Sequence, residues 1–262
     1  MTQVWNSLAD WLDRRRALAG RSIGFVPTMG ALHRGHASLV ERCRRENDVA
    51  VVSIFVNPTQ FNDPKDLDRY PRTLDGDLAL LRGLQVDDVF MPSAADLYPS
   101  GYGFRVEPGT SSQEMEGAFR PGFFQGVATV VLKLLNIVRP DRVYFGEKDY
   151  QQVKVIADMV DEFFVPTKVV PCPTVREASG LAESSRNMLL SSEARRKAAR
   201  ILQALTTSAN SAEARATLEA DGFAVEYVEE KWGRRFVAAY LEGVRLIDNV
   251  PVAVGHWGAE QE

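Results

Sequence analysis

The segment 48–56 (DVAVVSIFV) constrains the fold more than any other part of the sequence. A nearly unbroken run of β-branched and apolar residues is typical of a parallel strand that is covered on both faces. Shorter apolar runs alternate along the chain with helical patterns. The predicted strands are 22–26, 48–56, 88–91, 142–145 and 167–170, and the predicted helices are 3–19, 36–47, 74–84, 124–138 and 149–163. This alternation predicts an α/β fold with a Rossmann-like, doubly wound parallel sheet.

The character of the sequence changes after Pro173. Residues 174–187 are polar and irregular. Two helical patterns and three short apolar runs, which resemble antiparallel strands, follow at 191–208, 212–221, 223–228, 236–241 and 244–247. We therefore expect two domains: a larger Rossmann-like domain over residues 1–174 and a small α+β domain over residues 175–262.

The 262-residue chain carries a formal net charge of −4. Proteins that bind nucleic acid usually show a basic excess, so this balance argues against a nucleic-acid partner. The N-terminus lacks the apolar core and cleavage site of a secretory signal, and no apolar run has the length of a membrane span. Two distant cysteines, Cys43 and Cys172, indicate neither a disulfide framework nor a zinc site. We expect a cytoplasmic protein without a membrane partner.

The turn after the first predicted strand ends in the pattern H-x-G-H. Ligands of open α/β sheets bind beyond the carboxyl ends of the strands. His33 and His36 stand three residues apart at the start of a helix, where they share a face and where the helix favours an anion. The chain has neither a P-loop nor a G-x-G-x-x-G motif, so a nucleotide would have to use this turn. Its residues are Met29, Gly30, Ala31, Leu32, His33, Arg34, Gly35 and His36.

Two other interpretations of the histidine pair remain open at this point. The two rings could be structural, or they could bind a metal ion. A metal site has less support, because there is no H-E-x-x-H motif and the third histidine, His256, lies near the C-terminus. A nucleotide site is favoured because imidazoles that follow a strand can donate hydrogen bonds to phosphate oxygens.

Two further polar segments suit a phosphate site. The turn 146–149 (GEKD) follows a predicted strand and offers Lys148 as a point charge, although Asp149 could simply cap the next helix. The segment 184–187 (SSRN) offers two hydroxyls and a guanidinium on a stretch that could close over a triphosphate. An ordinary surface loop is the alternative interpretation of this segment.

Uncharged amides are found in two other places. The segment 55–61 (FVNPTQF) contains Asn57 and Gln60, and Gln151 and Gln152 stand near the start of a later helix. Such amides suit the recognition of a hydroxyl or carboxylate on a small substrate. The alternative is that they are buried amides bonded only to backbone.

Together these elements resemble the pantoate–β-alanine ligase (pantothenate synthetase) family from about residue 24 to residue 187. The matching stretches are GFVPTMGALHRGH (24–36), SIFVNPTQF (53–61), DLDRYPRTL (66–74), TVVLKLLNIVRPDRVYFGEKDYQQ (129–152), PTVRE (173–177) and SSRN (184–187), and RLIDN (245–249) also fits. The resemblance implies a Rossmann-like domain of the H-x-G-H nucleotidyl-transfer type with a small C-terminal lid. It also implies an ATP-dependent ligase that joins pantoate to β-alanine through a pantoyl-adenylate, releases AMP and pyrophosphate, uses Mg²⁺ and forms a homodimer.

The resemblance also implies roles for individual residues. The catalytic set would be His36 as general acid with His33, Lys148 and Arg186. ATP would lie along residues 29–36 and along Gly146, Glu147, Lys148 and Asp149, with Val175 near the adenine and Glu183, Ser184, Ser185 and Arg186 closing over the phosphates. Gln60 and Gln152 would hold pantoate, with Asn57 as a further candidate for substrate binding. The sequence fixes no metal ligand.

Three departures from the family pattern fall inside motifs. Phe123 stands where the family usually has histidine, Ser179 where it has aspartate, and Glu183 where it has methionine. A carboxylate about 5 Å from a phosphate charge costs about 3 kcal/mol at an effective dielectric of about 20. Our hypothesis is that Glu183 points away from ATP, or pairs with a nearby cation or Mg²⁺.

The departures leave several interpretations open. The chain could be a working pantoate–β-alanine ligase with tolerated drift, or a paralogous acyl-adenylate-forming amide ligase for another small acid or amine. It could also be a weakened ATP-binding protein, or a nucleotidyltransferase that releases its adenylylated product. The retained His33, His36, Lys148 and Arg186 argue against the weakened protein.

Overall fold

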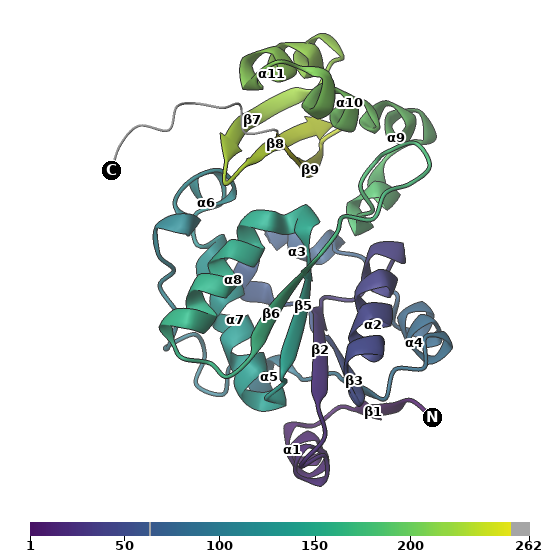
Figure 1. Cartoon of the computed structure of the whole chain (residues 1–262), viewed down its shortest axis with the longest axis vertical. Coiled ribbons are helices and arrows are strands. Elements are labelled where there is room, and N and C mark those ends of the chain that lie inside the picture. The colour runs from purple at the N-terminus through teal and green to yellow at the C-terminus, as the bar shows by residue number, and fades with distance from the viewer. Residues whose placement is uncertain (63, 253–262) are drawn as a thin grey trace. The chain divides into compact units, whose positions relative to one another are not determined.

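The computed structural model describes residues 1–62 and 64–252 of the chain. The chain divides into two compact units, Met1–Val175 and Arg176–Glu262, which are described separately below. Figure 1 shows the chain and labels most of its helices and strands.

The first unit is built on a six-stranded sheet in which every neighbouring pair of strands is parallel. The strand order is β1-β4-β3-β2-β5-β6. The strands are β1 (Gln3–Trp5), β2 (Ile23–Thr28), β3 (Val49–Ile54), β4 (Asp88–Phe90), β5 (Arg142–Gly146) and β6 (Lys168–Cys172). The predicted Rossmann-like parallel sheet is thus confirmed.

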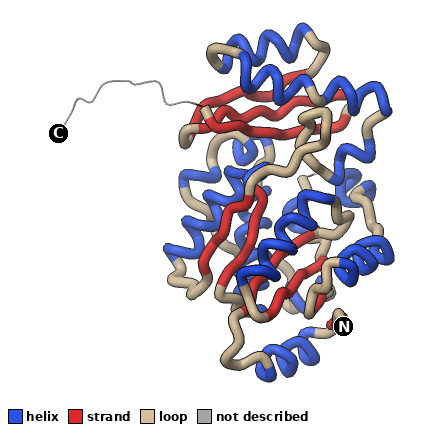
Figure 2. Tube along the Cα trace, turned by 45° about the vertical axis from the view of Figure 1, so that its right-hand side comes forward, coloured by secondary structure: helices blue, strands red, loops and turns tan. Residues whose placement is uncertain are grey.

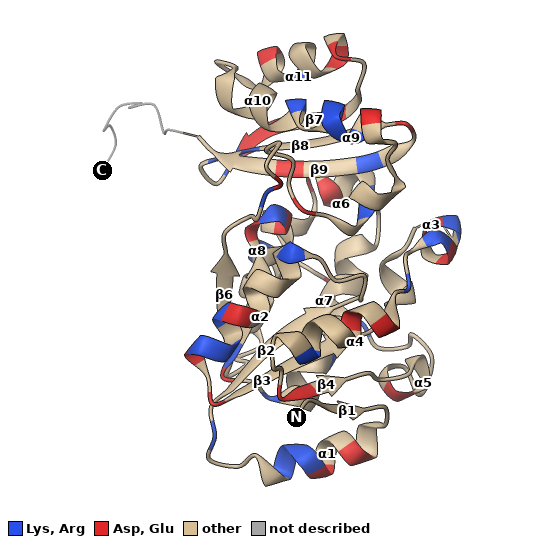
Figure 3. Cartoon of the chain, turned by 90° about the vertical axis from the view of Figure 1, so that its right-hand side faces the viewer, with Lys and Arg blue, Asp and Glu red and all other residues tan. Residues whose placement is uncertain are grey.

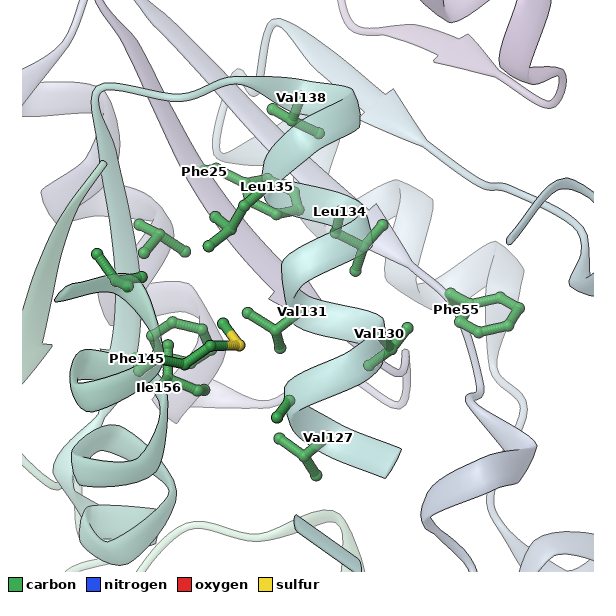
Figure 4. Close-up of a cluster of buried hydrophobic side chains, with 14 of the residues drawn as sticks. Phe25, Phe55, Val127, Val130, Val131, Leu134, Leu135, Val138, Phe145 and Ile156 are labelled. Carbon is green, nitrogen blue, oxygen red and sulfur yellow. The ribbon is translucent and has the colours of Figure 1, made fainter. Parts of the chain in front are cut away.

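Helices cover both faces of this sheet, as the apolar run in β3 requires. Val49 and Val51 belong to a core with α1, α7 and α8, whereas Ala50 and Val52 belong to a second core with α2 and α4. These helices are α1 (Leu8–Ala17), α2 (Arg34–Glu46), α4 (Leu74–Gly83), α7 (Phe123–Val138) and α8 (Tyr150–Glu162). Figure 4 shows side chains of α7 packed toward Phe25 and Phe145. Since alternate residues of a strand point to opposite faces, one run of valines serves both cores.

Short helical segments lie in the connections of the first unit. They are η1 (Pro58–Gln60), α3 (Pro64–Arg69), α5 (Ala94–Leu97), η2 (Thr110–Ser112), α6 (Glu116–Phe119) and η3 (Glu147–Asp149).

The N-terminus differs from the prediction. Residues 3–19 were expected to form one helix, but the first three of them form strand β1, which pairs in parallel with β4. Ser7 then caps α1, because its hydroxyl accepts a hydrogen bond from the Asp10 amide. An edge strand and a serine N-cap together override the helical pattern at this end.

The second unit contains a three-stranded antiparallel sheet, β7 (Ala224–Lys231), β8 (Arg234–Leu241) and β9 (Val244–Pro251). Helices α10 (Arg200–Thr207) and α11 (Ser211–Ala220) lie against this sheet (Figure 2). They pack on it through apolar side chains. The single helix predicted at 191–208 is wrong, since α9 (Ser192–Ala198) and α10 are separate and meet at Ala199. Among residues 1–62 and 64–252, no helix combines the length and apolarity needed to cross a membrane.

The parallel sheet determines where the candidate residues lie. Strands β3, β2 and β5 are consecutive neighbours in the sheet, so their carboxyl ends share one edge. The H-x-G-H turn follows β2, the N-P-T-Q turn of η1 follows β3, and η3 follows β5. Three segments that are far apart in sequence therefore meet at the edge where α/β proteins bind ligands.

Gly126 lets helix α7 approach the turn after β3 closely. A Cβ atom at this position would lie 2.4 Å from the carbonyl oxygen of Thr59. We predict that Gly126→Ala lowers the free energy of unfolding by about 1–3 kcal/mol, because the helix and the turn would have to separate. Urea unfolding measures this change.

Gly76→Ala is the matched control, since Gly76 is an exposed position of α4 with nothing within 4 Å of an added Cβ. The control variant is expected to be unchanged or more stable by up to about 1 kcal/mol, as for other Gly-to-Ala changes in helices. Equal effects of the two substitutions would contradict the proposed close contact.

Candidate active site

Backbone amides at the start of the H-x-G-H turn donate hydrogen bonds to side chains of β2 and α4, and these bonds hold the turn in place. The Gly30 amide donates to Thr28 Oγ1 at 3.2 Å. The carboxylate of Asp77, on helix α4, accepts hydrogen bonds from the Ala31 amide at 2.9 Å and from the Leu32 amide at 2.8 Å. Both Gly30 and Ala31 have positive φ, at +80° and +50°. The chain thus turns sharply between β2 and α2 and is held there by Asp77.

The two histidine rings are locked by backbone N–H groups. His33 is the N-cap residue of α2, and its Nδ1 accepts a hydrogen bond from the Gly35 amide at 3.1 Å. The Nδ1 of His36 accepts one from the His33 amide at 3.3 Å. A backbone amide only donates, so Nδ1 carries no proton in either ring, and a neutral ring keeps its proton on Nε2. Each imidazole therefore presents an Nε2–H donor.

Burial keeps both rings neutral. Together with a smaller effect of the Lys148 charge, it lowers the pKa of His33 from its usual 6.5 to about 4 and that of His36 to about 3. For His36, the neighbouring His33 adds to this effect. Unfolded histidines bind protons near pH 6.5, so the stability contributed by the neutral rings is complete above that pH and declines as the pH falls below it.

Lys148 comes to the same edge from β5. Its side chain is 17% exposed, and its Nζ lies 3.4 Å from Asp149 Oδ1. Asp149 occupies the N-cap position of α8, as predicted, although its side chain makes no capping hydrogen bond. The first unit thus places His33, His36 and Lys148 close enough to influence one another electrostatically, as the pKa shifts of the two rings show.

The amide of Asn57 is enclosed, and it orients Gln60. Asn57 is 1% exposed, and its Nδ2 donates to Gln60 Oε1 at 3.0 Å and to the Gly126 carbonyl at 3.3 Å. Its Oδ1 accepts hydrogen bonds from the hydroxyls of Tyr98 and Thr59. Because the oxygen of Gln60 accepts from Asn57, the Nε2 group of Gln60 remains as the donor of that side chain.

The two neighbouring glutamines at the start of α8 differ. Gln151 is buried, accepts from the Glu116 amide and donates to the carbonyls of Ser111 and Glu114, so it is an amide bonded only to backbone. Gln152 is partly exposed. Only Gln152 remains as the candidate for substrate binding in this pair.

Arg120 is a residue of this region that sequence reasoning missed. Its Nη2 donates to the Gln60 carbonyl at 3.3 Å, and its guanidinium lies 3.6 Å from the centre of the Phe123 ring. Glu116 pairs with the same guanidinium at 3.5 Å. Phe123, one of the three departures, therefore provides an aromatic face for a cation that contacts the Gln60 turn.

The S-S-R-N segment lies in the second unit and is anchored there. Ser184 caps η4 (Ser185–Leu189) and accepts from the Arg186 amide at 3.3 Å. Asn187 is buried and donates from Nδ2 to Glu177 Oε1 and to the Ala182 carbonyl, both at 3.0 Å. The ends of this segment are thus fixed by side-chain hydrogen bonds within its own unit.

Glu183 has a cation near its carboxylate. Arg195 donates hydrogen bonds to the Glu177 carboxylate, which raises the pKa of Arg195, and the negative charge of Glu183 also raises it. Arg195 belongs to the basic last turn of α9, which is blue in Figure 3. This neighbour agrees with one form of our hypothesis, in which a cation offsets the unusual carboxylate. The other departure, Ser179, accepts a hydrogen bond from the Leu181 amide at 3.4 Å.

The remaining candidates are distributed over both units. Val175 is the last residue of the first unit, whereas Arg186 with Glu183, Ser184 and Ser185 belongs to the second. His256 lies outside the described residues. Within residues 1–62 and 64–252, no group of three or more histidine, cysteine or acidic side chains is arranged to hold a metal ion.

An H-x-G-H turn and a lysine at adjoining strand ends of a doubly wound sheet define a nucleotide-binding α/β enzyme. The family model described as pantoate-beta-alanine ligase matches residues 1–251. The chain belongs to the pantoate–β-alanine ligase family, and it is therefore an ATP-dependent, amide-forming ligase. The family and the reaction class predicted from the sequence are thus confirmed.

Relatives and solved structures agree with this assignment. The chain is 53% identical to the pantothenate synthetase of Bdellovibrio bacteriovorus over 96% of this chain and 100% of that protein. It is 47% identical to the one from Legionella pneumophila over 94% and 98%. The Francisella tularensis ligase, solved as a complex with "Beta-gamma ATP" and β-alanine, has a TM-score of 0.92 and 44% identity and covers 96% of this chain and 98% of its own. The Thermus thermophilus enzyme has a TM-score of 0.86 and 45% identity, with 95% and 99% covered.

The geometry predicts the protonation state of both active-site histidines. In the His256→Gln protein, which leaves only two histidines, ¹⁵N NMR at pH 7 should show both rings as Nε2–H tautomers. Both should titrate below pH 5, since burial lowers their pKa values to about 4 and about 3. A titration midpoint near 6.5, or a protonated Nδ1 in either ring, would contradict the hydrogen bonds described above.

Proposed function

We propose that this chain condenses pantoate with β-alanine to pantothenate through a pantoyl-adenylate and releases AMP and pyrophosphate. The observation that carries this proposal is the pair of neutral Nε2–H imidazoles beside Lys148 at adjoining strand ends. The relative from Francisella tularensis, solved with a nucleotide and β-alanine, supports the choice of substrates.

The reaction needs stabilisation of charge more than it needs proton transfer. A carboxylate is a poor acyl donor, so it first attacks the α-phosphorus of ATP and displaces pyrophosphate. Negative charge then grows on the phosphate oxygens, where the Nε2–H groups of His33 and His36 and the ammonium of Lys148 would donate hydrogen bonds. The amine next attacks the acyl carbon, and AMP leaves with the electron pair of the broken bond.

The role of His36 as general acid stays a prediction from family resemblance. A ring whose pKa is lowered to about 3 is neutral at pH 7 and offers a hydrogen bond rather than a full proton. The structure therefore supports an electrostatic role for His36 more strongly than an acidic one. Arg186 would add a second cation from the S-S-R-N segment, with Ser184, Ser185 and Val175 as further contacts for ATP.

Pantoate would be held by amides at the end of β3 and the start of α8. Gln60 has its Nε2 group directed away from Asn57, and Gln152 is partly exposed. Neutral amides recognise hydroxyl and carboxylate groups without adding charge beside the triphosphate. Asn57, which is bonded on both sides inside the protein, would act by holding Gln60 in place.

Magnesium would be carried mainly by the nucleotide. The segment after β5 offers the carboxylates of Glu147 and Asp149, but the described part of the chain has no cage of three metal-binding side chains. Mg²⁺ commonly keeps several waters and binds through substrate phosphates. It would neutralise phosphate charge there. The family resemblance further supports a cytoplasmic homodimer.

The alternative substrates named above have no support among these relatives. The Bdellovibrio and Legionella proteins are both named pantothenate synthetase. The Phe123 ring packs against the Arg120 guanidinium, and the charge of Glu183 acts on the nearby Arg195, which favours tolerated substitutions over a changed reaction.

The first test is product formation from ATP, Mg²⁺, pantoate and β-alanine. We expect stoichiometric AMP, pyrophosphate and pantothenate, and we expect His36→Gln to lower the turnover by about 100- to 1,000-fold, as for the loss of one donor to a developing charge. Mass spectrometry and pyrophosphate release measure both. His256→Gln is the matched control and should keep its activity. A stable adenylylated product would instead indicate a nucleotidyltransferase.

The second test concerns Phe123. Phe123→Leu removes the aromatic face beneath Arg120, so the Gln60 turn should lose support and the KM for pantoate should rise by about 3- to 30-fold, the range of a cation–π contact. The KM for ATP should change little. Steady-state kinetics with each substrate varied in turn measures both KM values. Phe163→Leu, at an exposed phenylalanine that follows α8, is the control. Equal changes in both KM values would contradict a role confined to the pantoate side.

A further inference from the structure

We propose that Asp77 is a positioning residue of the adenylation site. Its carboxylate binds two successive peptide N–H groups of the H-x-G-H turn and thereby determines where His33 and His36 present their Nε2–H donors. This inference rests on the proposed function, because it concerns the same site. Asp77 lies on helix α4, far in sequence from the H-x-G-H turn, and would act through that turn rather than by touching a substrate.

The buried carboxylate of Asp77 accepts hydrogen bonds from two backbone amides and one hydroxyl. The side chain is 3% exposed, and Oδ2 accepts from the Ala31 amide at 2.9 Å. Oδ1 accepts from the Leu32 amide at 2.8 Å and from Thr73 Oγ1 at 3.1 Å. Hydrogen bonds to a carboxylate are roughly twice as strong as neutral ones. Both carboxylate oxygens of Asp77 thus accept hydrogen bonds within the protein, one from a single donor and the other from two.

The backbone of the turn requires such an anchor. Ala31 has φ of +50°, a conformation that costs a non-glycine residue about 1 kcal/mol or more. The preceding Gly30 has φ of +80°, and a Cβ added there would lie 3.0 Å from Asp77 Oδ2. The carboxylate therefore lies directly against the turn. Two charge-assisted hydrogen bonds offset the strain that the sharp reversal of the chain imposes.

The same contacts decide which groups can bind an anion. The amides of Ala31 and Leu32 are used by Asp77, that of Gly30 by Thr28, and those of His33 and Gly35 by the two imidazoles. These five amides are therefore already bonded within the protein and are not available to an anion. Phosphate recognition falls to the imidazole Nε2–H groups and Lys148, whose positions depend on the turn.

Asp77 acts on the rings through a short series of bonds. Its carboxylate accepts a hydrogen bond from the amide of Leu32, and Leu32 immediately precedes His33. The Nδ1 of His33 then caps the first turn of α2, and the amide of His33 fixes the ring of His36. A displacement of Leu32 would therefore move both donors together. An error of about 1 Å in such groups can reduce catalysis by about 100-fold.

Asp77→Asn tests this role. An asparagine side chain has one acceptor oxygen, and its NH₂ group would face one of the two amide donors, so one of the two bonds is lost. We expect kcat for adenylate formation to fall by about 10- to 100-fold, the KM for pantoate to stay within about twofold, and the ¹⁵N signals of both imidazoles to lose their single Nε2–H pattern. These fold-changes follow from the displacement argument. Asp75→Asn makes the same charge change at an exposed position of α4 and is the matched control.

Three outcomes would overturn the inference. Asp77→Asn could keep wild-type kinetics, or it could lose activity while both imidazoles keep their single tautomer, or it could affect activity no more than Asp75→Asn. Each would mean that the carboxylate does not position the rings.

Hydrogen exchange of the unmutated enzyme gives a second, independent measurement that also applies if Asp77→Asn fails to fold. The amides of Ala31 and Leu32 should be protected although they lie in a turn, and they should stay protected with ATP present. Unprotected amides would overturn the inference. Failure of the proposed function is distinguishable, because an enzyme that makes no AMP from pantoate would still give the tautomer and exchange readouts.

Discussion

The parallel alignment of β3, β2 and β5 is the constraint on which the rest of the structure depends. Parallel neighbours bring the ends of distant chain segments to one edge, and each segment contributes a different kind of group there. The turn after β2 supplies imidazoles, the turn after β3 supplies an amide, and the segment after β5 supplies an ammonium. The sheet is stable in this form because helices cover both of its faces.

At this edge of the sheet, the candidate site combines two neutral hydrogen-bond donors, the imidazoles of His33 and His36, with the charged ammonium of Lys148. The histidine rings are kept neutral by burial and by the nearby lysine, and their orientation is fixed by backbone amides. Oriented donors of this kind need no reorganisation when charge develops in a transition state. In the proposed site, imidazole and ammonium side chains would bind the phosphates in place of the backbone amides, which are already bonded within the turn.

The sequence was sufficient for much of the fold and for the central motifs. The valine-rich run of β3 predicted a covered parallel strand, and the H-x-G-H pattern after a strand predicted a nucleotide site. The short strand β1 was missed, because three residues carry too little periodicity to compete with the helical pattern that follows. Asp77 was missed because Ala31 and Leu32 are distant from it in sequence, and Arg120 because the Gln60 carbonyl that it binds is distant. For Asp77 one signal was present: it stands four residues before Leu81, on the buried side of α4.

The contact between Gly126 and the Thr59 carbonyl also matters for protein engineering. The backbone of α7 lies directly against the turn that carries Gln60, so this turn could not move toward the helix to admit a larger acid at the proposed site. A redesign for bulkier substrates would therefore have to shorten side chains that line the proposed site. The alternative would be to rebuild helix α7 and the turn after β3 together. The close contact that Gly126 permits would thus limit how much the acid specificity of the proposed site can change through single substitutions.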